Sequence, residues 1–294
     1  MAQFNLPPLD DSLYREGRVA FIRQETGIQD SEALKQHIIA VQKKAYAVKG
    51  FPCVRYFAFA WWVVVWERIS ELPAYREALK LGREREGAIL LDIGCCCGAD
   101  IRKVARDGWP VQNLIASDLY AGFWDVGHEL FRSTPETFPV AFLPGDALDP
   151  NFLQPFAPLG AASQLTDSPP ALASLTTLTP LRGRLSAIYV SSVFHLLSEA
   201  QQPKLAQSLA GLLSPLPGSL IFGCNLGEKV TGRVLLNQIQ PMLRFCHSPE
   251  SWIALWEGIF GKGTVKVEVE LIKKREMSDD GVDYNWLVWS VTRL

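Results

Sequence analysis

The stretch that decides the fold is ILLDIGCCCGAD, residues 89–100. Its apolar start is typical of a buried parallel strand, and the acid Asp92 stands where that strand ends. Gly94 and Gly98 then permit a tight turn into a helix, and such a turn brings backbone N–H groups close to a nucleotide-like ligand. The stretch therefore predicts a ligand site at the end of a central strand.

The glycines and cysteines of this stretch exclude two other kinds of site. The dinucleotide fingerprint G-x-G-x-x-G fails, because its second and third glycine positions hold Cys96 and Ala99, so NAD is disfavoured. Three adjacent cysteines point their sulfurs in diverging directions, and no His-x-x-His-like set lies nearby, so we expect no metal. All six cysteines are expected to be reduced thiols: Cys53, Cys95, Cys96, Cys97, Cys224 and Cys246.

Strands and helices alternate from residue 88 onward, which favours a doubly wound α/β fold with right-handed crossovers. One further segment alternates apolar and charged residues, and a second follows it after the turn-like SDDG. This pair predicts an antiparallel hairpin at the C-terminal end of the sheet. The predicted strands are 88–94, 113–119, 139–149, 185–197 and 218–227, the helices between them are 99–108, 123–133 and 199–215, and the hairpin is 264–272 with 282–294.

The first 86 residues are expected to be helical. Residues 30–48 begin at a cap candidate, Asp30 or Ser31, and place Leu34, Ile38 and Val41 on one helical face. The most apolar segment, 56–66, is shorter than the roughly 18 to 20 apolar residues that span a bilayer. The chain is therefore divided into an N-terminal helical cap, 1–86, and a ligand-binding core, 87–294.

Composition narrows the class of partner. The chain has 294 residues, of which 48% are hydrophobic, and this is enough apolar material for a substantial core. The formal net charge of −2 and the lack of a Lys/Arg block give no footprint for nucleic acid. The N-terminus lacks a secretory signal pattern, so we expect a cytoplasmic protein with a small-molecule substrate. The oligomeric state stays open.

Acids at three strand ends carry a resemblance to a known family. The run Asp92-Ile93-Gly94-Cys95-Cys96-Cys97-Gly98, followed by Asp118 in IASDL and Asp146 in PGDAL, resembles class I S-adenosylmethionine (SAM)-dependent methyltransferases. The resemblance implies a Rossmann-like seven-stranded sheet, with Asp118 on the ribose hydroxyls and Asp146 near adenine. The alternative is that these acids only cap helices. The implied cofactor-binding residues are Asp92, Gly94, Cys95, Cys96, Gly98, Asp118, Leu119, Asp146, Ala147 and Ser191.

Longer matches narrow the resemblance. The cysteine-rich loop, the SDL at 117–119 and DVGHELF at 125–131 are similar to fungal methyltransferases of small-molecule biosynthesis, including those of meroterpenoid clusters. The fourth strand ends in SSVFH, 191–195, without the (D/N/S)-PP-(Y/F) signature of enzymes that methylate amino groups of nucleic acid or protein. Methylation of an oxygen is therefore favoured.

His195 is the candidate base or substrate contact, because it follows the end of the fourth strand. A carboxylate acceptor needs no base, whereas a phenol with a pKa near 10 benefits from one. We expect SAM-dependent O-methylation of a hydrophobic secondary metabolite, with a carboxyl acceptor first and a phenol second, and with S-adenosylhomocysteine as product. The alternatives are a SAM-fold protein that catalyses cyclisation or rearrangement, and a scaffold without cofactor affinity. The substrate-site candidates are Tyr56, Trp61, Trp62, Ser192, His247 and Trp252.

Overall fold

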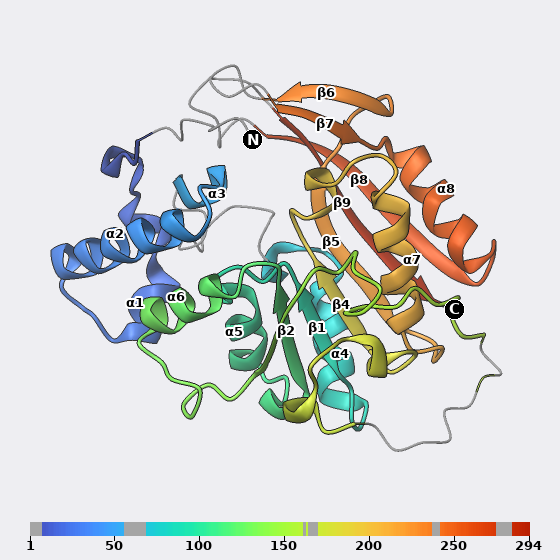
Figure 1. Ribbon diagram of the computed structural model, residues 1–294, viewed down its shortest axis with the longest axis horizontal. Helices are drawn as coiled ribbons and strands as arrows, with labels where there is room; N and C mark the ends of the chain where they lie inside the picture. Colours follow the sequence, from blue (N-terminus) through green and yellow to red (C-terminus); the bar gives the residue numbers. More distant parts are fainter. Residues whose placement is uncertain (1–7, 56–68, 161–162, 164–169, 237–241, 275–283) are drawn as a thin grey trace.

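A seven-stranded sheet organises the chain (Figure 1). The computed structural model describes residues 8–55, 69–160, 163, 170–236, 242–274 and 284–294. The strand order is β3-β2-β1-β4-β5-β9-β8; β1 to β5 run parallel, while β9 is antiparallel to both β5 and β8. This confirms the predicted doubly wound sheet and C-terminal hairpin. The strands are β1 (Leu90–Ile93), β2 (Leu114–Asp118), β3 (Ala141–Pro144), β4 (Ala187–Val190), β5 (Leu220–Leu226), β8 (Val265–Lys274) and β9 (Tyr284–Arg293).

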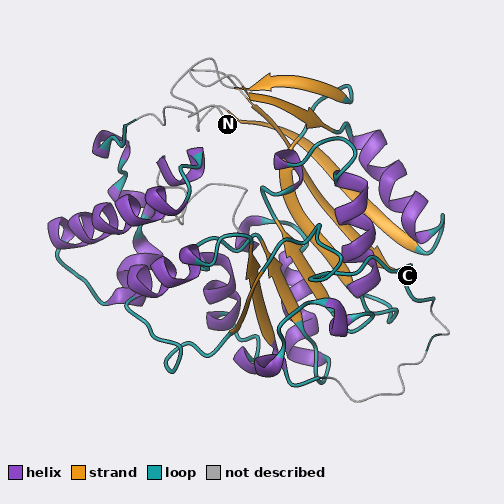
Figure 2. Cartoon of the chain, in the orientation of Figure 1, coloured by secondary structure: helices purple, strands orange, loops and turns teal. Residues whose placement is uncertain are grey.

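Both faces of the sheet are covered by helices (Figure 2). Successive side chains of a strand point to opposite faces, and Leu90 and Leu91 of β1 accordingly belong to different core clusters. Leu91 packs in the cluster that includes residues of α7 (Gln202–Leu212) and α8 (Pro249–Phe260). Leu90 packs in the cluster with α4 (Tyr75–Glu84) and α5 (Ala99–Arg106). A strand buried on both faces explains the unbroken apolar run in the sequence.

The N-terminal helices form a separate cluster around α6 (Gly122–Phe131), visible at the left of Figure 1. They are α1 (Ala20–Thr26), α2 (Ser31–Val48) and α3 (Pro52–Arg55). Asp30 caps α2, because its Oδ1 accepts the N–H of Ala33 at 2.8 Å. The division at residue 86 stays a prediction, and α4, which precedes it, packs on the sheet instead of on this cluster.

A second, two-stranded sheet was not predicted from the sequence. It consists of β6 (Gly232–Leu236) and β7 (Met242–Cys246), which pair antiparallel beyond the end of β5, at the top of Figure 1. A bridge between Gly227 and His247 joins it to the main fold. Short 3₁₀ helices complete the described elements: η1 (Asp11–Leu13), η2 (Glu16–Arg18), η3 (Ile69–Glu71), η4 (Val111–Asn113), η5 (Leu172–Ser174), η6 (Thr179–Leu181) and η7 (Phe194–Leu196).

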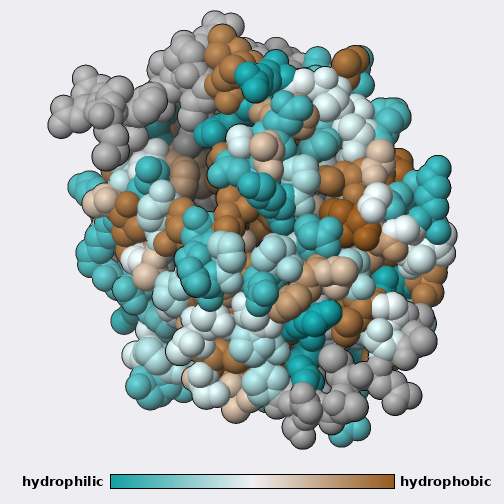
Figure 3. All heavy atoms as spheres, turned by 45° about the vertical axis from the view of Figure 1, so that its right-hand side comes forward, coloured by the Kyte–Doolittle hydropathy of each residue, from teal (hydrophilic) through white to brown (hydrophobic). Residues whose placement is uncertain are grey.

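The surface mixes polar and apolar residues. Figure 3 shows one face, where hydrophobic residues form several separate groups between hydrophilic ones. Leu235 and Leu243 face each other across the β6–β7 ladder and are 66% and 59% exposed. No helix in the described part of the chain is long and apolar enough to cross a membrane.

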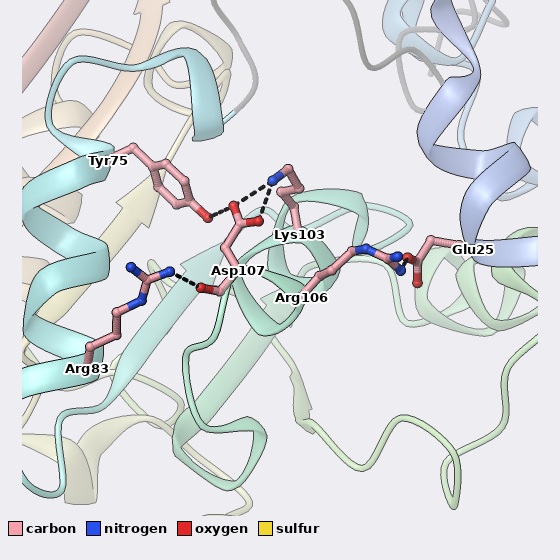
Figure 4. A network of polar contacts seen from close by, with 6 residues as sticks. All are labelled: Glu25, Tyr75, Arg83, Lys103, Arg106 and Asp107. Carbon is pink, nitrogen blue, oxygen red and sulfur yellow. Dashed lines mark hydrogen bonds and ion pairs between the residues drawn. The ribbon is translucent and has the colours of Figure 1, made fainter.

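Polar contacts around Asp107 fix the position of α5 (Figure 4). The Tyr75 hydroxyl donates to Oδ2 of Asp107 at 2.6 Å, and Nζ of Lys103 donates to the same oxygen at 2.6 Å. Arg83 donates to the main-chain oxygen of Asp107, so two residues of α4 hold the end of α5. Arg106 pairs with Glu25 of α1. The helix that starts at the glycine-rich turn is therefore anchored at its other end to two neighbouring helices.

Candidate functional site

The loop between β1 and α5 is a tight turn held by backbone hydrogen bonds. Gly94 N donates to the oxygen of Ser117 at 2.8 Å, and Gly98 N donates to the oxygen of Cys95 at 2.8 Å. Both glycines have positive φ, +77° and +69°, which side chains disfavour. A Cβ on Gly94 would also stand 2.4 Å from Cγ2 of Val193. The two glycines of the opening stretch are therefore required by the turn and by the approach of the chain after β4.

Cys96 joins the first acidic motif to the second. Its N–H donates to Oδ2 of Asp118 at 2.8 Å, and Tyr120 N donates to Oδ1 at 2.9 Å. Burial raises the pKa of Asp118, while the amide donors of Tyr120 and Cys96 lower it by favouring the charged form. Cys96 itself has φ of 50°, so this non-glycine residue adopts the left-handed conformation that glycine favours.

Asp146 follows the third strand, beside Asp118. Gly145 N donates to the main-chain oxygen of Asp118 at 3.0 Å, which holds the end of β3 against the end of β2. Asp146 is exposed, and its Oδ1 accepts the N–H of Leu148 at 2.9 Å. Its neighbour Ala147 is half-buried, and Leu119 is 55% exposed. The acids of the second and third motifs therefore lie at adjacent strand ends.

Asp92 lies at the centre of the same edge. It is 2% exposed, and β1 pairs it with Ala116 on one side and Tyr189 on the other. A carboxylate enclosed in this way stabilises a neighbouring positive charge strongly, because little water screens it. Its place beneath the loop fits a cationic ligand group.

The serines after β4 are held against β5. Ser192 N donates to the oxygen of Cys224 at 2.8 Å, and Oγ of Ser191 donates to that oxygen at 3.3 Å. Ser192 has φ of 57° and is half-buried. The next residue, Val193, covers Gly94 of the loop, so both serines border the region of the glycine turn.

The thiols of Cys95 and Cys96 are neutral. Burial raises the pKa of Cys95 well above its usual range. For Cys96, a hydrogen bond between its sulfur and that of Cys97, 3.9 Å apart, raises the pKa, and burial adds to the effect. Thiols of this kind are poor nucleophiles. Their geometry favours the interpretation of the cysteines as packing residues of the loop.

His195 lies on η7 and is 9% exposed. Its Nδ1 accepts the N–H of Leu226 at 3.2 Å, and its ring meets the Trp286 ring edge to face at 5.9 Å. Burial, and then the positive charge of Arg244, lower the pKa of His195 to about 3. The ring is thus neutral, and the lone pair of Nδ1 is already used by the backbone, which leaves it badly placed to take a proton.

Trp252 lies in the aromatic core of this structure, and its role as a substrate-site residue stays a prediction. It is 0% exposed and packs edge to face on Phe194 and against Trp289. His247 lies in the same cluster, with its ring 5.2 Å from that of Trp252 and its Nδ1 2.8 Å from Oγ of Ser251. Burial lowers the pKa of His247 to about 4. The apolar face of α8 draws both side chains into the core. Tyr56, Trp61 and Trp62 lie outside the described residues.

Two residues at the site were missed by the sequence reasoning. A Cβ on Gly127 would stand 2.3 Å from the main-chain oxygen of Cys97, so α6 packs directly on the glycine-rich turn. A glycine inside a helix was the available signal, since it costs helical stability and needs a packing reason. Val193 has no such signal, because its contact with Gly94 depends on the pairing of β1 with β4.

The sequence of the chain is similar to those of known methyltransferases. The family model described as the meroterpenoid methyltransferase N-terminal domain matches residues 6–60. The chain is similar to methyltransferase ausD of Penicillium brasilianum, with 31% identity over 234 residues, 80% of this chain and 73% of that protein. It is also similar to O-methyltransferase atr3 of Stereocaulon alpinum, with 28% identity over 264 residues, 90% of this chain and 67% of that protein. The solved structure of Burkholderia thailandensis 1,6-didemethyltoxoflavin-N1-methyltransferase has a TM-score of 0.45 and 13% identity, covering 76% of this chain and 80% of its own.

Proposed function

Since this chain belongs to the fungal methyltransferase family that includes ausD of Penicillium brasilianum, we propose that it methylates a carboxyl group of a hydrophobic small molecule. Relatives that are methyltransferases imply SAM as the methyl donor. The O-methyltransferase atr3 supports oxygen as the acceptor atom. The match of residues 6–60 to a meroterpenoid methyltransferase domain supports a terpenoid-type acceptor.

The strand-end acids support the proposed placement of the cofactor, and the hydrogen bond from Cys96 to Asp118 is the observation that carries it. Each carboxylate oxygen of Asp118 accepts one backbone N–H and keeps lone-pair capacity for a ribose diol, which offers two donors. Asp92 would face the sulfonium and ammonium end, and Asp146 the adenine. When bound, SAM supplies an electrophilic methyl group on a positively charged sulfur. The turn at Gly94 and Gly98 would position that group, and positioning contributes much of the rate of an in-line displacement.

The state of His195 supports a carboxyl acceptor over a phenol. A phenol must lose its proton, and the natural base would be this histidine. Its Nδ1 is occupied by Leu226 N–H, and burial opposes the imidazolium that proton transfer would create. A carboxylate is already ionised at neutral pH and needs no base. A phenolic acceptor stays the second candidate. We further propose a cytoplasmic location, a compartment in which thiols such as those of Cys95 and Cys96 stay reduced.

Two acids can separate methylation of a carboxyl group from methylation of a phenol and from rearrangement. The purified protein is titrated calorimetrically with SAM and then incubated with 2,4-dihydroxybenzoic acid, which carries both kinds of acceptor, and with farnesoic acid. We expect a gain of one methyl group that mild alkali removes, because esters hydrolyse and phenol ethers do not. An alkali-stable product would favour the phenol, and conversion without mass gain would favour rearrangement. Failure to bind SAM would overturn the cofactor placement.

Asp118→Asn tests the ribose contact. The substitution keeps the size of the side chain but removes its charge and replaces one acceptor oxygen with a donor, so SAM affinity should fall about 10- to 100-fold. Asp125→Asn, on the exposed face of α6, is the matched control and should leave the affinity unchanged. Calorimetry measures both. Equal affinity in Asp118→Asn and the wild type would contradict the assignment.

A further inference from the structure

Arg244 brings a positive charge to the region after β4. It lies on β7, opposite Val234 in the ladder, and its Nη1 donates to the main-chain oxygen of Leu196 at 3.4 Å. This oxygen belongs to the residue directly after His195, and β7 packs against η7. Arg244 is half-buried, so its guanidinium is partly withdrawn from water. A charge in such a place acts more strongly on a bound anion than an exposed one.

His195 presents a hydrogen-bond donor in the same region. Leu226 N–H donates to Nδ1, so in the neutral ring the proton resides on Nε2. Nε2 of His195 has no hydrogen-bond partner among the described residues. It differs from Nε2 of His247, which is fully enclosed and also lacks a partner. The tautomer is therefore set by the backbone of β5, and the ring offers an N–H where a ligand oxygen could accept it.

His195 follows closely on the residue that covers the glycine-rich turn. Val193, two residues before His195, is the side chain that covers Gly94. The chain from β4 to η7 thus runs from the expected cofactor position to His195 and then to Leu196, where Arg244 is attached. A cation and a neutral N–H donor therefore lie along the segment that leaves this turn, and neither group can accept a proton readily.

Resting on the proposed function, we propose that Arg244 and the Nε2–H of His195 together bind the carboxylate of the methyl acceptor. Two donors, one of them charged, match an anionic oxygen, whereas a phenolic O–H would require an acceptor. In the reaction, one carboxylate oxygen forms the new O–CH3 bond as the S–CH3 bond breaks and its electron pair stays on sulfur. No proton moves. The ester formed is neutral, so the attraction to Arg244 that holds the substrate is lost with the product.

The kinetic test compares wild type with Arg244→Gln, Arg244→Lys and Arg233→Gln. Arg233 lies on β6 of the same hairpin with a 67% exposed side chain and is the matched control. With farnesoic acid as acceptor, Arg244→Gln should raise KM about 10- to 100-fold and change kcat little, because a charge-assisted contact to the substrate is lost. Arg244→Lys should recover part of the loss. Arg233→Gln should match wild type, and affinity for S-adenosylhomocysteine should be equal in all four proteins.

A second measurement observes His195 directly and does not depend on turnover. Nitrogen NMR of ¹⁵N-histidine-labelled protein should show His195 protonated on Nε2, with Nδ1 as acceptor. Addition of farnesoic acid in the presence of S-adenosylhomocysteine should shift Nε2 in wild type and Arg233→Gln, but less in Arg244→Gln.

The outcomes separate this inference from the function on which it rests. An unchanged KM in Arg244→Gln, a proton on Nδ1 of His195, or no shift of Nε2 with farnesoic acid would each overturn the carboxylate site. If wild type transfers no methyl group to either acid, the proposed function fails by itself. The NMR titration then still decides whether Arg244 and His195 bind a carboxylate.

Discussion

Cys96 stabilises the glycine-rich turn through a backbone hydrogen bond, although its own backbone conformation is unfavourable. Its left-handed conformation, with φ of 50°, aims its N–H at Asp118 while its side chain packs beside Cys97. A glycine would adopt this conformation freely but would leave the space of the thiol empty. The cysteine therefore combines a strained backbone with a small apolar filler, and the three cysteines of the opening stretch serve structure more than chemistry.

Replacement of Cys96 by a β-branched residue should expose this strain. Cys96→Val should lower the free energy of unfolding by about 1 to 2 kcal/mol, because a branched Cβ clashes with the backbone at positive φ. Urea denaturation measures the change. The control is Cys95→Val, one position earlier, where φ is not positive. Similar losses for the two variants would show that packing, not φ, governs the loop.

Helix α5 illustrates how elements place the site. Its first residue, Ala99, follows the glycine turn, and its C-cap, Asp107, is held by Tyr75 of α4. Burial, and then the hydrogen bond to Asp107, raise the pKa of Tyr75, so its hydroxyl stays a donor. Residues of α4 therefore hold the far end of the helix that begins at the glycine turn.

Removal of that hydroxyl isolates its contribution. Tyr75→Phe should cost about 1 to 2 kcal/mol of stability, since a buried hydrogen bond to a carboxylate is lost while Lys103 keeps its contact. Denaturant unfolding checks this value. Tyr120→Phe is the control, because the Tyr120 ring packs on Phe51 and Phe123 and its hydroxyl makes no hydrogen bond within the described residues. A loss below that of the control would mean that the contact with Asp107 contributes nothing.

At the scale of the whole molecule, buried histidines link stability to pH. Burial lowers the pKa of His195 to about 3 and that of His247 to about 4, against about 6.5 in an unfolded chain. Between these values the unfolded state binds more protons than the folded state. The histidine contribution is therefore fully present above about pH 7 and decreases as pH falls from about 6.5 toward 4.

This linkage predicts acid lability. From pH 7 to pH 5, each of the two histidines should remove on the order of 2 kcal/mol from the free energy of unfolding. Tryptophan fluorescence during urea unfolding at both pH values measures the sum. His195→Gln should decrease the pH-dependent loss by on the order of 2 kcal/mol, because the contributions of the other titrating groups are common to both proteins and cancel in the difference. An undiminished loss in the variant would show that His195 is not a buried neutral group in solution.

Prediction from the sequence succeeded where local pattern and packing agree. Apolar runs ending in an acid predicted β1 and β2, because a strand buried on both faces must be apolar and parallel strands end at one edge. It missed β6 and β7, whose exposed Leu235 and Leu243 break the alternation that marks a half-buried strand. It did not reveal that Trp252 is fully buried, because an aromatic residue has the same local signature in a pocket wall and in a core.

The sequence by itself determined the sheet, the glycine turn and the family, since these depend on periodicity, on backbone conformations that favour glycine and on motifs close together in the chain. Only the tertiary structure decided the state of His195 and its proximity to Arg244. The position of the ring proton of His195 follows from the N–H of Leu226 on β5, and the electric field at the ring follows from Arg244 on β7. These two residues lie 31 and 49 positions after His195 in the chain. Hydrogen bonding and burial act through space, so no local pattern around residue 195 carries them.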